Sequence, residues 1–180
     1  VALLGWELGW RVDQAMGGQV WGPAAATLAP GLAALVVWRL RSRPAWPVAA
    51  HWPAYLLASL VLVGLQMLLA ATMSTDLAGD PAPLTYIPLL NPFGIAMLFA
   101  MLTGFLSLVV WKRAMGAEPT ESASQGFMIY RGGVWFLAWV LTTAAVIRGV
   151  HHYTGIPWDG DALFDSVVVQ TSLSIWWSLL

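Results

Sequence analysis

The residues of this chain whose types could do chemistry gather in residues 151–165, which read HHYTGIPWDGDALFD. Two histidines and three carboxylates lie here between two apolar runs. Asp159 and Asp161 are one residue apart, and such a pair can hold a divalent cation that carries a diphosphate, because hard cations take oxygen ligands. One hypothesis is therefore an enzyme that acts at the outer membrane face on lipid-linked sugars or another envelope intermediate.

The same residues also have a structural interpretation, which we favour. Asp159-Gly160 is a turn signal, Asp161 can cap the helix that follows, and Asp165 can stabilise the first turn of that helix through its dipole. The Gly and Glu positions that would complete a calcium loop are missing. The sequence therefore predicts neither a bound metal nor a cofactor, and it leaves the question of an enzyme open while leaning against one.

Three further candidates precede the carboxylates. His151 and His152 are adjacent, so on a helix their side chains point about 100° apart and cannot easily share one metal. Arg148 lies one turn before His152, where its long stem can carry the charge to the outer interface. These three residues are either ordinary interfacial groups or a proton-handling or anion-binding set. With Asp159 and Asp161 they are the weak candidates for a catalytic site.

The composition indicates that these side chains are positioned by membrane helices. The chain is 59% hydrophobic and 9% charged, whereas soluble domains carry roughly 25% charged residues. A net charge of -1 and the absence of a basic block argue against nucleic-acid binding. The surface must therefore face lipid or other helices, and we expect the bilayer and further transmembrane helices of the same chain as partners.

A membrane helix needs about 20 mostly apolar residues. Four complete spans are predicted at about 20–38, 54–73, 93–111 and 132–150. A truncated span is predicted at 166–180, and residues 1–9 are predicted to be the tail of an earlier one. The predicted fold class is thus all-α, a polytopic transmembrane helix bundle, with residues 1–180 a fragment of one multi-span membrane domain. The polar segment 116–125 (GAEPTESASQ) is predicted to be a flexible linker.

The cations predict the orientation, because cytoplasmic connectors are enriched in Lys and Arg. Six of the eight cations lie on one side of the predicted spans: Arg39, Arg41, Arg43, Lys112, Arg113 and Arg131. Connectors 41–52 and 112–131 are therefore predicted to be cytoplasmic. Connectors 11–19, 74–92 and 151–165 are predicted to be periplasmic or extracellular, with the chain in a bacterial inner membrane.

The last span carries polar residues at steps of four: Ser166, Gln170, Ser174 and Ser178. Such a stripe is typical of close helix packing or of a wet groove. Gln66, Thr103 and Ser107 on other spans are the candidate partners for packing. A wet groove would instead predict a transporter of a neutral solute, lined by Gln66, Gln170 and Ser174.

Two short runs carry a resemblance to a known family. Residues 88–92 (PLLNP) open a span, and residues 169–177 (VQTSLSIWW) lie near the end of the chain. Over roughly residues 50–180 the sequence resembles the Domain of Unknown Function 2339 family of long bacterial multi-span membrane proteins. The resemblance implies a late segment of a much longer protein, and it brings no settled activity or site residues. The function expected is a structural or envelope-related segment of an uncharacterised polytopic inner-membrane protein, with its substrate unknown.

Overall fold

The computed structural model describes residues 1–17, 19–41 and 46–179, and within these ranges every regular element is a helix. The elements are α1 (Ala2–Met16), α2 (Trp21–Arg41), α3 (Trp52–Asp76), α4 (Pro92–Met115), α5 (Glu121–Thr154), α6 (Gly160–Asp165) and α7 (Val167–Ser178). Helices α2 to α5 are long and apolar enough to cross a membrane. The prediction of an all-α polytopic membrane bundle is therefore confirmed.

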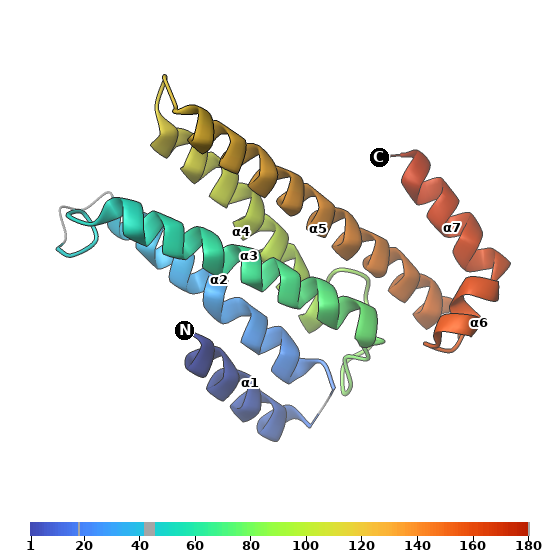
Figure 1. Ribbon diagram of the computed structural model, residues 1–180. Helices are drawn as coiled ribbons and strands as arrows, with labels where there is room; N and C mark the ends of the chain where they lie inside the picture. The colour runs from blue at the N-terminus through green and yellow to red at the C-terminus, as the bar shows by residue number, and fades with distance from the viewer. Residues whose placement is uncertain (18, 42–45, 180) are drawn as a thin grey trace.

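Helices α2, α3, α4 and α5 pack side by side, with α1 against α2 and α7 against the far face of α5 (Figure 1). The core where α2 to α5 meet consists largely of small and unbranched side chains, including Ala24, Met67, Ala70, Met97 and Ala138. Small side chains let helix backbones approach closely in lipid, where packing rather than water exclusion drives association. This core holds α3, α4 and α5 together near the end of the bundle where the candidate residues lie.

Glycines set the contact between α1 and α2. A Cβ on Gly9 would lie 2.9 Å from the carbonyl oxygen of Gly22, and a Cβ on Gly22 would lie equally close to the carbonyl oxygen of Gly9. The two backbones therefore touch where neither helix has a side chain. Gly5 and Gly9 are spaced four apart on α1, the arrangement that brings membrane helices into close contact.

Two helices extend well beyond the predicted spans. Helix α1 continues to Met16, so most of the predicted 11–19 connector is helical. Helix α5 begins at Glu121 instead of residue 132, because Thr120 caps it and its first turns pack on α4. There the ring of Trp111 meets Phe127 and Tyr130 at centroid distances of 5.8 and 5.2 Å. The second half of the predicted 116–125 linker is thus part of a packed helix.

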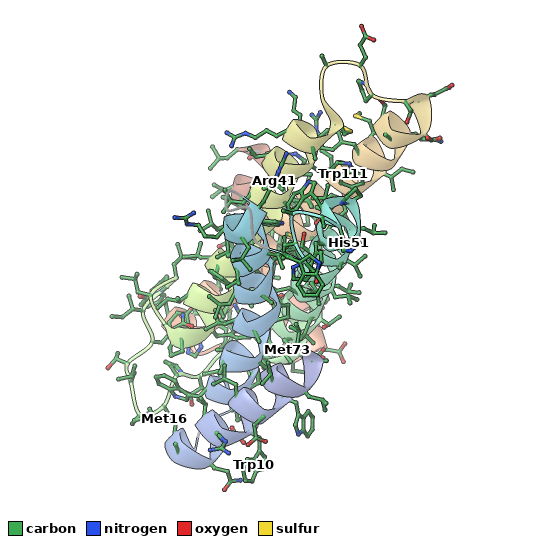
Figure 2. The ribbon with its side chains drawn as sticks, turned by 90° about the vertical axis from the view of Figure 1, so that its left-hand side faces the viewer. Trp10, Met16, Arg41, His51, Met73 and Trp111 are labelled. Carbon is green, nitrogen blue, oxygen red and sulfur yellow. The ribbon has the colours of Figure 1, made fainter. Side chains whose placement is uncertain are left out.

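The cations lie where the helices end. Arg39 and Arg41 are in the last turn of α2, and Lys112 and Arg113 are in the last turn of α4, where positive charge is favoured by the helix dipole. Figure 2 shows Arg41, His51 and Trp111 toward one end of the bundle and Trp10 and Met16 toward the other. Gly18, residues 42–45 with Arg43, and Leu180 lie outside the described residues.

Candidate functional site

Arg148 is the centre of the candidate region, and it is buried. Only 2% of its surface is exposed. Its Nη2 donates to the carbonyl oxygen of Ser74 at 2.8 Å and to that of Leu77 at 3.5 Å. These carbonyls belong to the end of α3, where no later helical N–H can reach them. The prediction that Arg148 extends to the outer interface is wrong, because the side chain turns inward and completes the end of α3.

Gly79 is the reason that Arg148 can lie there. It has a φ of +83°, and a Cβ placed on it would lie 2.3 Å from Cδ of Arg148 and 2.6 Å from its Nε. The backbone of the 77–91 connector therefore rests directly on the arginine stem. Only glycine combines this left-handed conformation with the close approach.

The other groups around the guanidinium are a sulfur atom and aromatic rings rather than carboxylates. Nη1 donates to Sδ of Met97 at 3.6 Å, and Cζ lies 4.9 Å from the ring centre of Phe93 and 5.6 Å from that of Trp158. The Nε–H has no hydrogen-bond partner. Among the described residues, no carboxylate forms an ion pair with Arg148. Aromatic faces and carbonyl oxygens thus provide its stabilisation.

The two histidine rings meet edge to face at 4.7 Å between centroids, and their other contacts are separate. A ring nitrogen of His152 bonds the carbonyl oxygen of Ala78 at 3.1 Å, and the ring stacks on Tyr86 at 3.8 Å between centroids. His151 instead bonds the carbonyl oxygen of Ile156 through Nδ1, and its ring meets the edge of Trp158. Burial raises the pKa of the Tyr86 phenol despite the opposing charge of Arg148. The phenol therefore stays neutral at physiological pH.

The carboxylates are placed by short helices. Asp159 caps α6, since its Oδ2 accepts from the backbone N–H of Ala162 at 3.3 Å. Asp161 lies in the first turn of α6, Asp165 ends that helix, and Ser166 caps α7. The prediction that Asp161 is the cap is therefore wrong, because the helix begins at Gly160 rather than after a turn. Asp159 and Asp161 are both exposed.

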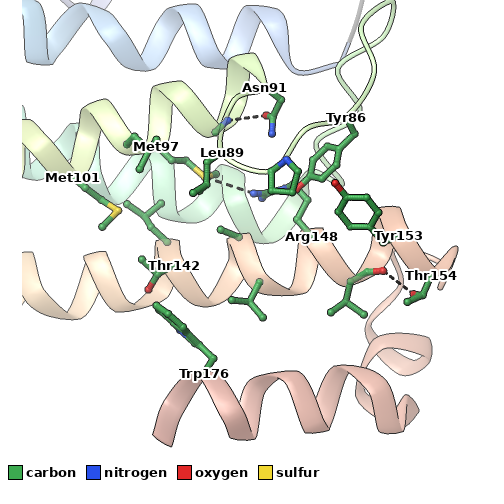
Figure 3. A pocket seen from close by; sticks show the side chains of 18 residues that line it. Tyr86, Leu89, Asn91, Met97, Met101, Thr142, Arg148, Tyr153, Thr154 and Trp176 are labelled. Carbon is green, nitrogen blue, oxygen red and sulfur yellow. Dashed lines mark hydrogen bonds between the residues drawn. The ribbon is translucent and has the colours of Figure 1, made fainter. Parts of the chain in front are cut away.

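Two cavities flank this region. The larger, about 560 Å³, lies along α4 and α5 below the 77–91 connector, and Arg148 is part of its wall. Figure 3 shows the Arg148 side chain reaching from α5 toward Met97, with Tyr86 and Leu89 nearby. The smaller cavity, about 380 Å³, includes Asp76 and Asp159. Among the described residues, no three acidic or histidine side chains are grouped so as to hold a metal ion.

The polar residues of α7 do not bond the polar residues of the other spans that were predicted as their partners. Gln66 is fully buried and accepts a hydrogen bond from Thr103 at 3.1 Å. Gln170 and Ser174 are exposed on α7 and bond carbonyl oxygens of Phe164 and Gln170. The predicted pairing of the α7 stripe with Gln66 is therefore wrong. Among the described long helices, α7 makes its main contacts with α5, and a solute path lined jointly by Gln66, Gln170 and Ser174 stays a prediction.

Sequence reasoning missed the connector residues that complete the site. Gly79 and Tyr86 carry no motif, and their roles depend on a helix about 70 residues later in the chain. The sequence of residues 88–92, by contrast, did predict the start of a membrane span. Leu89 has a φ of +63°, and Asn91 caps α4 by accepting from the N–H of Gly94 at 2.8 Å. This turn forms the entrance to α4 beside the larger cavity.

A family model described as "Predicted membrane protein (DUF2339)" matches residues 1–180. The match covers the whole chain and therefore extends the resemblance expected for residues 50–180. No curated protein matches the chain, and no solved structure matches it.

Proposed function

Because the chain belongs to the DUF2339 family of predicted membrane proteins, we propose that it is a structural, envelope-related part of a polytopic bacterial inner-membrane protein. Its exposed apolar faces contact lipid and further transmembrane helices of the same polypeptide. The polar residues at the outer end of the bundle fasten helices and connectors to one another. Their proposed role is to hold these helices and connectors in position.

The observation that carries the proposal is the attachment of the connector after α3. Trp21 of α2 donates through Nε1 to the carbonyl oxygen of Ala82 at 2.9 Å. His152 and Arg148 of α5 bond the carbonyl oxygens of Ala78 and of Ser74. Side chains from two helices thus bind backbone groups that would otherwise be unpaired near lipid, where each such group costs several kcal/mol. This use of an Arg and a His supports a structural role.

The proposed orientation places connectors 41–52 and 112–131 in the cytoplasm and 11–19, 74–92 and 151–165 in the periplasm. Fusions of alkaline phosphatase, which is active only after export, should therefore be active after Asp80 and Asp161 and inactive after Ala117. The reverse pattern would contradict the orientation. Equal activity at Asp80 and Ala117 would contradict the alternation of the spans.

Removing the carboxylate charges while keeping their hydrogen bonds tests the structural role. Asn caps helices as well as Asp does, so Asp159→Asn should leave α6 intact and remove an acid that chemistry would need. In a deletion strain that has a growth phenotype under envelope stress, we expect Asp159→Asn and Asp161→Asn to complement it as well as the native protein does. Loss of complementation with normal protein levels and thermal stability would contradict the proposal.

An enzyme at the outer face is the second candidate, and the smaller cavity favours it, since Asp76 and Asp159 both line that cavity. Carboxylates are ligands that Mg²⁺ and Mn²⁺ accept. Under this candidate, manganese should bind the purified protein at millimolar concentration and should not bind the Asp76→Asn/Asp159→Asn variant. Absence of manganese binding by the native protein would count against the enzyme.

A further inference from the structure

Beyond this structural role, we propose that the larger cavity binds an anionic phospholipid of the surrounding leaflet. One acyl chain lies along α4 and α5, and the phosphate group lies beside Arg148. The cavity, about 560 Å³, lies within the range of roughly 300–1,000 Å³ for sites that hold small molecules. The proposal rests on three observations: the charge at one end, the apolar wall, and the access from the lipid side.

The charge comes from Arg148. Only 2% of the residue is exposed, it lines the cavity, and its Nε–H, which lies against Gly79, has no hydrogen-bond partner. A buried cation is costly unless it is paired, and among the described residues no carboxylate pairs with it. The first turn of α4, represented in the wall by Asn91 and Gly94, adds the positive end of a helix dipole. Both features select an anionic group.

The rest of the wall is apolar. Met97, Met101, Leu141, Val146 and Trp176 line it, and flexible Met side chains adapt well to ligands of irregular shape. An acyl chain has the length and chemistry to follow such a wall. A free inorganic anion would use only the Arg148 end and would leave the apolar surface uncovered.

The cavity is reachable from the lipid side. Leu98 and Tyr153 contribute to its wall, and they are 42% and 70% exposed on the surface of the bundle. Tyr153 lies in the last turn of α5, at the level where headgroups meet the hydrocarbon. A lipid can therefore enter sideways with its head group beside the end of α5.

Gly149 provides a position from which a larger side chain can be introduced into the cavity. It lines the cavity, and a Cβ on it would meet nothing within 4 Å. Gly149→Phe therefore places a ring in the cavity. Gly132→Phe is the matched control, because Gly132 lies on the same helix, its Cβ position is equally open, and it does not line the cavity.

The experiment uses the purified protein in phosphatidylcholine vesicles. The vesicles contain a trace of phosphatidylglycerol or of phosphatidylcholine, each with the same diazirine-bearing acyl chain. After illumination, peptides that contain Leu98, Met101 and Thr142 should be labelled by the phosphatidylglycerol probe. Gly149→Phe should lower this labelling roughly tenfold, which corresponds to about 1.4 kcal/mol, and Gly132→Phe should leave it unchanged.

Three results would overturn the proposal. Equal labelling by the two probes would show that charge does not select the occupant. Labelling that survives Gly149→Phe would place the lipid elsewhere. Absence of labelling on these peptides would indicate that another helix covers the cavity. Arg148→Gln, used only if the protein remains folded, should abolish the preference for phosphatidylglycerol while retaining the labelling pattern.

Discussion

Replacing Gly79 by alanine should lower the thermal unfolding midpoint of the protein more than the same replacement at Gly155. Both glycines lie in connectors and have a positive φ, +83° and +73°. Alanine in this conformation costs about 1–2 kcal/mol at either position. At Gly79 the new Cβ would also lie 2.3 Å from Cδ of Arg148, whereas at Gly155 it would meet nothing within 4 Å.

The additional contact at Gly79 should cost a further 1–3 kcal/mol or so, the usual range for overpacking. The stem of Arg148 cannot move freely, because its guanidinium is held by the end of α3 and by Met97. The unfolding midpoint can be followed in detergent by the fluorescence of the 12 tryptophans. Equal shifts for Gly79→Ala and Gly155→Ala would show that the connector does not rest on Arg148.

Replacing Arg148 by alanine should have a similarly large effect. The change removes a hydrogen bond from a charged donor to the carbonyl oxygen of Ser74, a type of bond that contributes about 1.5–3 kcal/mol. It also leaves carbonyl groups at the end of α3 without a partner and opens space beneath Phe93. The expected result is a lower unfolding midpoint and a larger fraction of aggregated protein on gel filtration.

Two variants test whether the loss of stability comes from the hydrogen bonds that Arg148 makes with the end of α3. Arg148→Lys keeps the charge, but an ammonium cannot reach Ser74 and Met97 together as the guanidinium fork does. Its unfolding midpoint should therefore lie between those of the native protein and Arg148→Ala. Arg131→Ala, at an exposed position on the same helix, should change stability within about 0.5 kcal/mol. A comparable loss in Arg131→Ala would mean that any arginine on α5 matters equally.

The long helices could be predicted because the bilayer fixes their length and their composition. Runs of apolar residues bounded by Trp, Pro and cations mark α2, α3 and α4 closely. The start of α5 could not be found in this way. Residues 116–125 are polar enough to suggest a linker, and the chain from residue 121 on is helical because Thr120 caps α5 and Trp111 on another helix packs against Phe127.

The candidate site could be located from the sequence but not interpreted. An arginine one turn from a helix end can turn outward to the interface or inward to the bundle. The outcome for Arg148 depends on the connector that carries Gly79, about 70 residues earlier in the chain. The local sequence also predicted Asp161 as the cap, whereas the structure has Asp159 there. The choice of Asp159 follows from where α6 begins, at Gly160.

The central claim is that the connector after α3 rests on the buried stem of Arg148, and a double-mutant cycle of Gly79→Ala and Arg148→Ala tests it most directly. Alanine at position 148 has no Cδ or Nε, so in that background Gly79→Ala should cost only the strain of its backbone, as at Gly155. The two changes should then be coupled by at least about 1 kcal/mol, within the range for residues in contact. Additive effects on the free energy of unfolding would contradict the claim.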